Sequence, residues 1–121
     1  MSDKLSIVSY LNRIDLLKET ADQIIKDFQM SGFEITFSGN SDNAYKELFI
    51  QIYPHINELL GKNYEGFMNL LYRIDLDERL VLRKSEENKH QNTAELITDL
   101  IMKRELQKIV IRNYYKQNGT I

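Results

Sequence analysis

Apolar side chains recur at every third or fourth position along most of this chain, and this spacing constrains the fold more than any other feature. At about 100° per residue, such positions line one side of an α-helix. The pattern predicts four helices, at roughly 3–30, 43–60, 64–84 and 92–116. We therefore expect an all-α, four-helix bundle-like fold with all 121 residues in a single helical domain.

One short segment departs from the helical spacing. In residues 33–37, FEITF, the apolar residues Phe33, Ile35 and Phe37 alternate with polar ones, which is the pattern of a β-strand. A lone strand leaves its backbone hydrogen bonds unpaired unless it finds a partner. The segment is therefore either one minor strand element in a mainly α-helical fold or an extended loop.

Two positions bear on where the helices end. Pro54 lies inside the second helix, but the apolar spacing keeps its phase across the proline, whose ring falls on the polar side. We expect a single bent helix over 43–60, because a proline on the solvent side can bend a helix without ending it. In the third helix, Asp75 and Glu78 have the spacing of a capping box, so a break near 75–77 is compatible with the sequence.

The segment 84–92, KSEENKHQN, contains no apolar residue and is predicted to be a solvated linker. Within it, Glu87 and His90 have the Glu-x-x-His spacing of di-iron helical bundles. Those ligands project into a bundle core and need a second copy of the motif, so we predict no metal site and no cofactor. The last helix is expected to begin with Asn92 as its cap and Glu95 three residues later.

Motifs of enzyme chemistry are missing from the sequence. It has no cysteine and no Gly-x-Ser-x-Gly turn, and His55 and His90 have no obvious serine or acid partner in sequence. Gly61-Lys62 lacks the flanking residues of a phosphate-binding loop. The acidic run 75–78 fits a helix cap better than a Mg²⁺ site. We therefore predict no catalytic residue and favour a non-enzymatic protein, with an enzyme of dispersed active-site residues as a third alternative.

The tetrapeptide Arg-Ile-Asp-Leu occurs twice, at 13–16 and 73–76. On a helix its isoleucine lies on the core stripe, whereas its leucine points almost to the opposite side. Around the second copy, Tyr72, Leu76 and Leu80 form a second apolar stripe. A helix that is apolar on two sides is either central in a bundle or has a partner outside its chain. We expect this stripe to be an interface with a second copy or another protein.

The last helix carries a basic stripe formed by Arg104, Lys108, Arg112 and Lys116 at four-residue intervals. Residues 103–116 have a net charge of +4 in a chain of net charge −2, so the remainder carries −6. Such a stripe can contact phosphates or an acidic protein surface. Cations also gather near a helix C-terminus simply because the helix dipole favours them there. Binding of RNA or another acidic ligand is therefore the alternative function.

Composition and the N-terminal sequence bear on location. No apolar run approaches the roughly 18 residues of a membrane span, and Asn12, Arg13 and Asp15 interrupt the apolar run that a secretory signal needs. One proline, three alanines, fourteen isoleucines and ten asparagines suggest AT-rich coding. We therefore expect a bacterial cytoplasmic protein that makes no membrane contact. Its favoured function is a protein–protein interaction or self-association module, with a homo-oligomer or another protein as partner.

Overall fold

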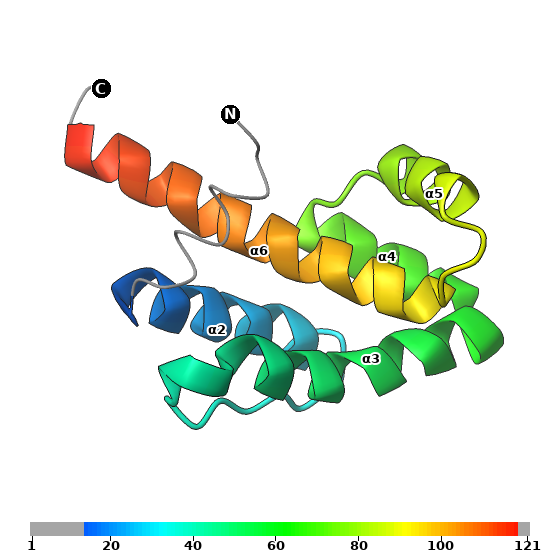
Figure 1. Ribbon diagram of the computed structural model, residues 1–121, viewed down its shortest axis with the longest axis horizontal. Coiled ribbons are helices and arrows are strands. Elements are labelled where there is room, and N and C mark those ends of the chain that lie inside the picture. Colours follow the sequence, from blue (N-terminus) through cyan, green and yellow to red (C-terminus); the bar gives the residue numbers. More distant parts are fainter. Residues whose placement is uncertain (1–13, 119–121) are drawn as a thin grey trace.

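The structure, a computed structural model, describes residues 14–118 (Figure 1). Within this range the helices are α2 (Ile14–Gln29), the short 3-10 helix η1 (Ser41–Asn43), α3 (Ala44–Lys62), α4 (Tyr64–Ile74), α5 (Glu78–Glu87) and α6 (Thr93–Asn118). The all-α prediction is confirmed, because the described residues contain five packed α-helices and no β-strand. Residues 3–13 of the first predicted helix lie outside the described range.

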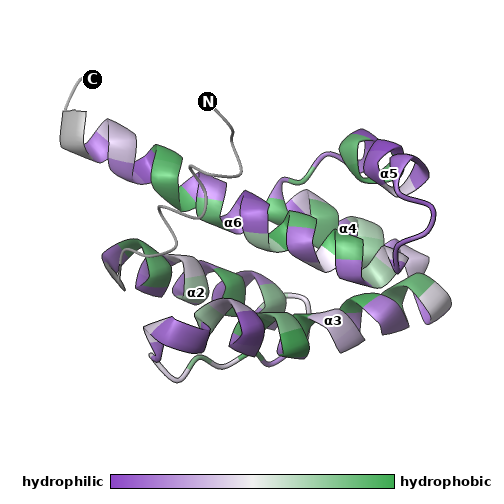
Figure 2. Cartoon of the chain, in the orientation of Figure 1, coloured by the Kyte–Doolittle hydropathy of each residue, from purple (hydrophilic) through white to green (hydrophobic). Residues whose placement is uncertain are grey.

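The central helix is α6. It packs against α2 and α3 and also contacts α4 and α5, which places it in the middle of the bundle (Figure 1). By contrast, α5 lies at the edge of the bundle and is largely hydrophilic (Figure 2). Buried residues occur on more than one side of α6; they include Ile97, Ile101, Met102, Leu106 and Ile109. The two-sided apolar pattern of this helix therefore reflects, over most of its length, its central place in the chain's own bundle.

The segment 33–37 is an extended connection and not a strand, which decides between the two alternatives that its alternating pattern left open. Ile35 is buried, and the two flanking phenylalanines pack against the core, which accounts for the alternating pattern. The backbone N–H of Thr36 donates to Oε1 of Gln51 on α3 (2.9 Å), and Nε2 of Gln51 donates to the Thr36 carbonyl (2.7 Å). One side-chain amide thus bonds the backbone as a partner strand would.

Pro54 lies inside one continuous helix, as predicted for 43–60. Its ring is exposed, and the buried residues of α3 lie on other sides of the helix: Ala44, Leu48, Ile52, Ile56 and Leu59. Proline leaves the carbonyl four residues earlier without its helical N–H partner. That residue is Ile50, which is also exposed, so water can take the place of the missing donor.

The third predicted helix is two helices, with the break at 75–77. Asp75 ends α4 by adopting the left-handed conformation (φ 65°), and the N–H of Leu76 then donates to the carbonyl of Leu71 (2.9 Å). The carboxylate of Asp77 caps α5 by accepting the N–H of Arg79 (2.9 Å). The sequence pattern placed this cap at Asp75, which is wrong by two residues.

This break removes the second apolar stripe expected on the third helix. Tyr72 is 89% exposed on α4, whereas Leu76 lies in the turn and is 6% exposed within the chain's own core. Leu80 belongs to α5 and is half-buried. The expected stripe geometry is wrong, because a chain that turns at Asp75 no longer places these three side chains on one helical face. In the first copy of the tetrapeptide, Leu16 is likewise buried.

The linker predicted at 84–92 is shorter than expected, because α5 continues to Glu87. A helical turn at the surface needs no apolar residue, and Lys84 and Glu87 lie 4.0 Å apart across it. Asn92 caps α6 as predicted, since its Oδ1 accepts the N–H of Glu95 (3.1 Å). Among residues 14–118, no helix combines the length and apolarity that crossing a bilayer requires.

Replacing Leu76 with Glu is expected to destabilise the fold, because a charge would enter the core without a partner. The free energy of unfolding should fall by about 3 kcal/mol or more, measured by urea unfolding followed by circular dichroism. The matched control is Leu82→Glu, since Leu82 is exposed on α5; its effect should stay within about 0.5 kcal/mol. Equal losses in the two variants would contradict the burial of Leu76.

Candidate functional site

Arg104, the first residue of the basic stripe, joins α6 to the turn between α4 and α5. Its Nε donates to the main-chain carbonyl of Asp75 (2.8 Å), and its Nη2 pairs with the Asp75 carboxylate (2.9 Å). Its Nη1 donates to the side chain of Gln107 (2.6 Å). Each guanidinium nitrogen therefore already has an acceptor, and the guanidinium holds the left-handed residue that ends α4.

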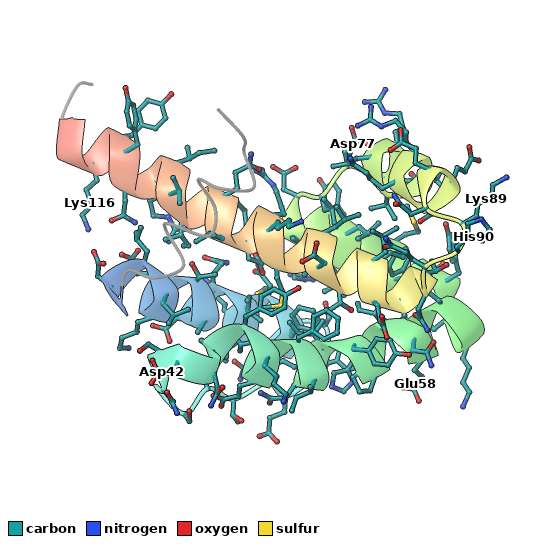
Figure 3. The ribbon with its side chains drawn as sticks, in the orientation of Figure 1. Asp42, Glu58, Asp77, Lys89, His90 and Lys116 are labelled. Carbon is teal, nitrogen blue, oxygen red and sulfur yellow. The ribbon has the colours of Figure 1, made fainter. Side chains whose placement is uncertain are left out.

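A surface pocket of about 420 Å³ lies at this turn, and it is lined by Met68, Leu71, Tyr72, Asp75, Leu76, Asp77, Glu78 and Arg104. Its acidic residues do not converge on a metal ion: Asp75 pairs with Arg104, and Asp77 caps α5. His90 is exposed in the linker after α5, at the edge of the molecule (Figure 3). Within residues 14–118 there is no group of three or more His, Cys, Asp or Glu residues that could hold a metal ion.

Further along α6, polar side chains reach across to α2. The contacts are Lys108 with Asp27 (3.2 Å), Arg112 with Gln23 (3.1 Å) and Asn113 with Glu19 (3.4 Å). Residue numbers rise along α6 as they fall along α2, so the two helices run antiparallel, side by side (Figure 1). Lys116, the last residue of the stripe, is exposed near the C-terminal end of α6 (Figure 3). Most of the stripe therefore contacts the chain itself.

An acidic residue, Glu105, is completely buried beside these contacts (0% exposed). Its Oε1 lies 2.7 Å from Nζ of Lys108, which also lies 3.2 Å from Oδ2 of Asp27. Asp27 is buried too, and its Oδ1 accepts a hydrogen bond from Nε2 of Gln23 (3.0 Å). Two buried carboxyl groups thus share one ammonium group where α2 meets α6. We call Asp27, Glu105 and Lys108 the acid–lysine cluster.

The electrostatics of the cluster favour a protonated Glu105. Burial raises the pKa of Glu105 to about 8, and its hydrogen bond with Asp27 adds to the rise, while Lys108 opposes it. Nζ of Lys108 is shared between Glu105 and Asp27, so among the described residues Glu105 has no donor to itself. A protonated Glu105 needs no such donor, because it donates to Asp27 itself. The cluster is then neutral, with Lys108 balancing Asp27.

Sequence reasoning singled out Lys108 but neither carboxyl partner. One signal for Glu105 was present: it lies four residues after Ile101 and four before Ile109, both buried. An acid in phase with core isoleucines is therefore an acid in the core. Because Glu105 has no exposed surface, it cannot touch a substrate, and its chemistry is limited to holding or releasing a proton.

A second polar group joins α6 to α3. The hydroxyl of Tyr45 donates to Oδ1 of Asp99 (2.6 Å), and Nζ of Lys103 lies 2.7 Å from Oδ2 of Asp99. Burial and the nearby Asp99 carboxylate raise the pKa of the Tyr45 hydroxyl well above its ordinary value. Tyr45 therefore stays a hydrogen-bond donor, and this group acts as a link between helices.

The last turns of α6 present apolar side chains to solvent. Ile111, Tyr114 and Tyr115 are 45%, 61% and 60% exposed, and their spacing places them on one side of the helix. The two tyrosine rings meet edge to face, with centroids 5.5 Å apart. Between them in sequence, Arg112 and Asn113 turn towards α2 instead. We call Ile111, Tyr114 and Tyr115 the aromatic face of α6.

Comparison with known proteins gives no family to which this chain could be assigned. No protein-family model matches it, and neither does a curated protein or a solved structure. Its function is therefore inferred from the two features of α6 described above, the acid–lysine cluster and the aromatic face.

Replacing Glu105 with Gln is expected to flatten the dependence of stability on pH. The pKa of Glu105 is raised from an ordinary 4.5 to about 8 in the folded state, so its contribution is present below pH 4.5 and is lost as pH rises to about 8. Between these values the free energy of unfolding should fall by up to about 1.4 kcal/mol per pH unit. Glutamine cannot ionise, so the variant should lack this fall.

The measurement is urea unfolding at a series of pH values. The matched control is Glu86→Gln, which removes one carboxylate from an exposed position on α5 and should keep the pH dependence of the wild type. A Glu105→Gln variant whose stability falls with pH as steeply as that of the wild type would contradict the assignment of this dependence to Glu105.

Proposed function

We propose that this chain is a non-enzymatic self-association module that docks on a second copy through the aromatic face of α6. The observation that carries the proposal is the joint exposure of Ile111, Tyr114 and Tyr115 on one side of the helix. Tyrosine supplies a large apolar surface with a polar tip, and it is enriched among the residues that dominate protein interfaces. In a symmetric contact each copy contributes the same residues, so the buried area counts twice.

The charge distribution favours a second copy as the partner. Residues 103–116 carry +4, whereas the rest of the chain carries −6. Lys116 is exposed near the aromatic face, and a carboxylate from the acidic remainder of a second copy can pair with it. Complementary charges of this kind mainly set the orientation and the rate of association.

The alternative, binding of RNA or another acidic ligand, is less well supported. Arg104, Lys108 and Arg112 each contact an acceptor in their own chain. A phosphate would have to compete with these contacts, and nucleic-acid binding usually draws on several phosphate contacts at once. The Tyr72, Leu76 and Leu80 surface is also less suitable for docking, because Leu76 belongs to the core.

The double variant Ile111→Ser, Tyr115→Ser is expected to be a monomer at concentrations where the wild type is an oligomer. Both side chains are exposed, so their loss should leave the helical content unchanged. Sedimentation equilibrium up to about 1 mM protein is the measurement, because it detects association as weak as about 4 kcal/mol. Circular dichroism checks the fold.

The matched control is Tyr64→Ser, Tyr72→Ser, which removes two exposed tyrosines from α4. It should associate like the wild type. A wild type that remains a monomer over the whole concentration range would overturn the proposal, and so would a control variant that alone loses association.

A further inference from the structure

The contact between α2 and α6 contains ionisable groups that water does not reach. Asp27 and Glu105 are both buried, and so are their apolar neighbours Phe28 and Leu106. A charge that appears at this position cannot be hydrated while the two helices stay packed. Burying an unpaired charge is among the most costly changes inside a protein.

The two protonation states of Glu105 differ in how well the charges and hydrogen bonds of the cluster are balanced. When Glu105 carries its proton, one carboxylate faces one ammonium and the charges cancel. When Glu105 loses its proton, two carboxylates face the single ammonium of Lys108. Gln23 still donates to Asp27, whereas the donor that the described residues place beside Glu105 is Nζ of Lys108, which is shared with Asp27. A further donor for the ionised Glu105 would have to be water, which reaches this buried side chain only if the helices separate.

We propose that the acid–lysine cluster is a pH-sensitive clasp, which holds α2 against α6 while Glu105 is protonated and releases α2 when that proton is lost. The clasp is independent of the aromatic face, because it acts between helices of one chain. Release would detach α2 from the central helix and expose apolar residues such as Phe28. The fold would thereby convert a change of pH into exposed apolar surface.

The charged groups around Glu105 support this assignment. Asp27 from α2 and Lys108 from α6 are the ones that act on its protonation. Arg104, its neighbour in sequence, is directed to the turn between α4 and α5, and Asp99 is bonded to α3. The residues that α3 and α4 contribute to the core are apolar; they include Leu48, Ile52, Phe67 and Leu70. The protonation of Glu105 is therefore determined by the residues of the cluster itself.

The pH range over which the clasp opens follows from the pKa of Glu105 in the packed and the separated states. In the packed state its pKa is about 8, and in a hydrated state the pKa returns towards 4.5. Between these values the separated state binds fewer protons than the packed state, so each rise of one pH unit favours separation by up to about tenfold. From pH 6 to pH 8 the opening equilibrium constant should rise by up to about 100-fold, and above that it should level off.

Amide hydrogen exchange in the full chain tests the clasp at pH 6, 7 and 8, with each rate divided by the intrinsic rate at the same pH. In the wild type, protection of the α2 amides between Ile24 and Phe28 should fall with pH by up to about 100-fold. Protection of the α5 amides should stay constant, because α5 lies at the edge of the bundle, packs against α6 and can open without the release of α2.

Glu105→Gln should make α2 protection independent of pH, whereas the exposed control Glu86→Gln should behave like the wild type. Asp27→Asn is a second test that does not rely on the first variant folding. It leaves one carboxylate with one ammonium, so the fall between pH 6 and 8 should disappear. The proposal is overturned if wild-type α2 protection is the same at all three pH values, or if Glu105→Gln keeps the wild-type fall. It is also overturned if every helix loses protection equally, which would indicate global destabilisation alone.

Discussion

The enclosure of α6 by the other helices is the constraint on which the rest of the structure depends. A polar side chain on a largely enclosed helix meets little water, so partners inside the chain take its place. Arg104 finds a partner in the turn between α4 and α5, Lys108 finds one on α2, and Asp99 finds one on α3. Each bond leads to a different element. The bonds that satisfy the polar groups of α6 therefore also fix where its neighbours lie.

Features governed by local rules could be predicted from the sequence. The course of α3 through Pro54 and the cap of α6 at Asn92 follow from residue spacing within a few turns. The boundary between α4 and α5 was harder, because a continuous helix and a broken one both satisfy the apolar spacing. What distinguishes them is the left-handed Asp75, whose carbonyl and carboxylate are held by Arg104, 29 residues later. A contact that distant leaves no mark on the local pattern, so the expected stripe around Leu76 was wrong.

The candidate site shows the same division between local and distant information. The basic stripe is a local pattern and was visible in the sequence. That its cations contact α2 and not a ligand was not visible, since Lys108 and Asp27 are 81 residues apart. The burial of Glu105 could have been inferred from its phase with Ile101 and Ile109. The position of the second carboxyl group, that of Asp27 on α2, could not have been inferred from the sequence. Because Asp27 already pairs with Lys108, an ionised Glu105 has no positive charge left to balance it.

The amide of Gln51 also determines how the connection between α2 and α3 is aligned. In a β-sheet, the alignment of a strand is distributed over a ladder of bonds. Here all the bonds that Gln51 makes to the segment go to one residue, Thr36. A slip by one position would turn Ile35 out of the core, because side chains alternate along an extended chain. Gln51 thus sets the register of the segment, and one turn earlier on α3 the carboxylate of Glu47 fixes the end of the segment by accepting the N–H of Ser38 (2.7 Å).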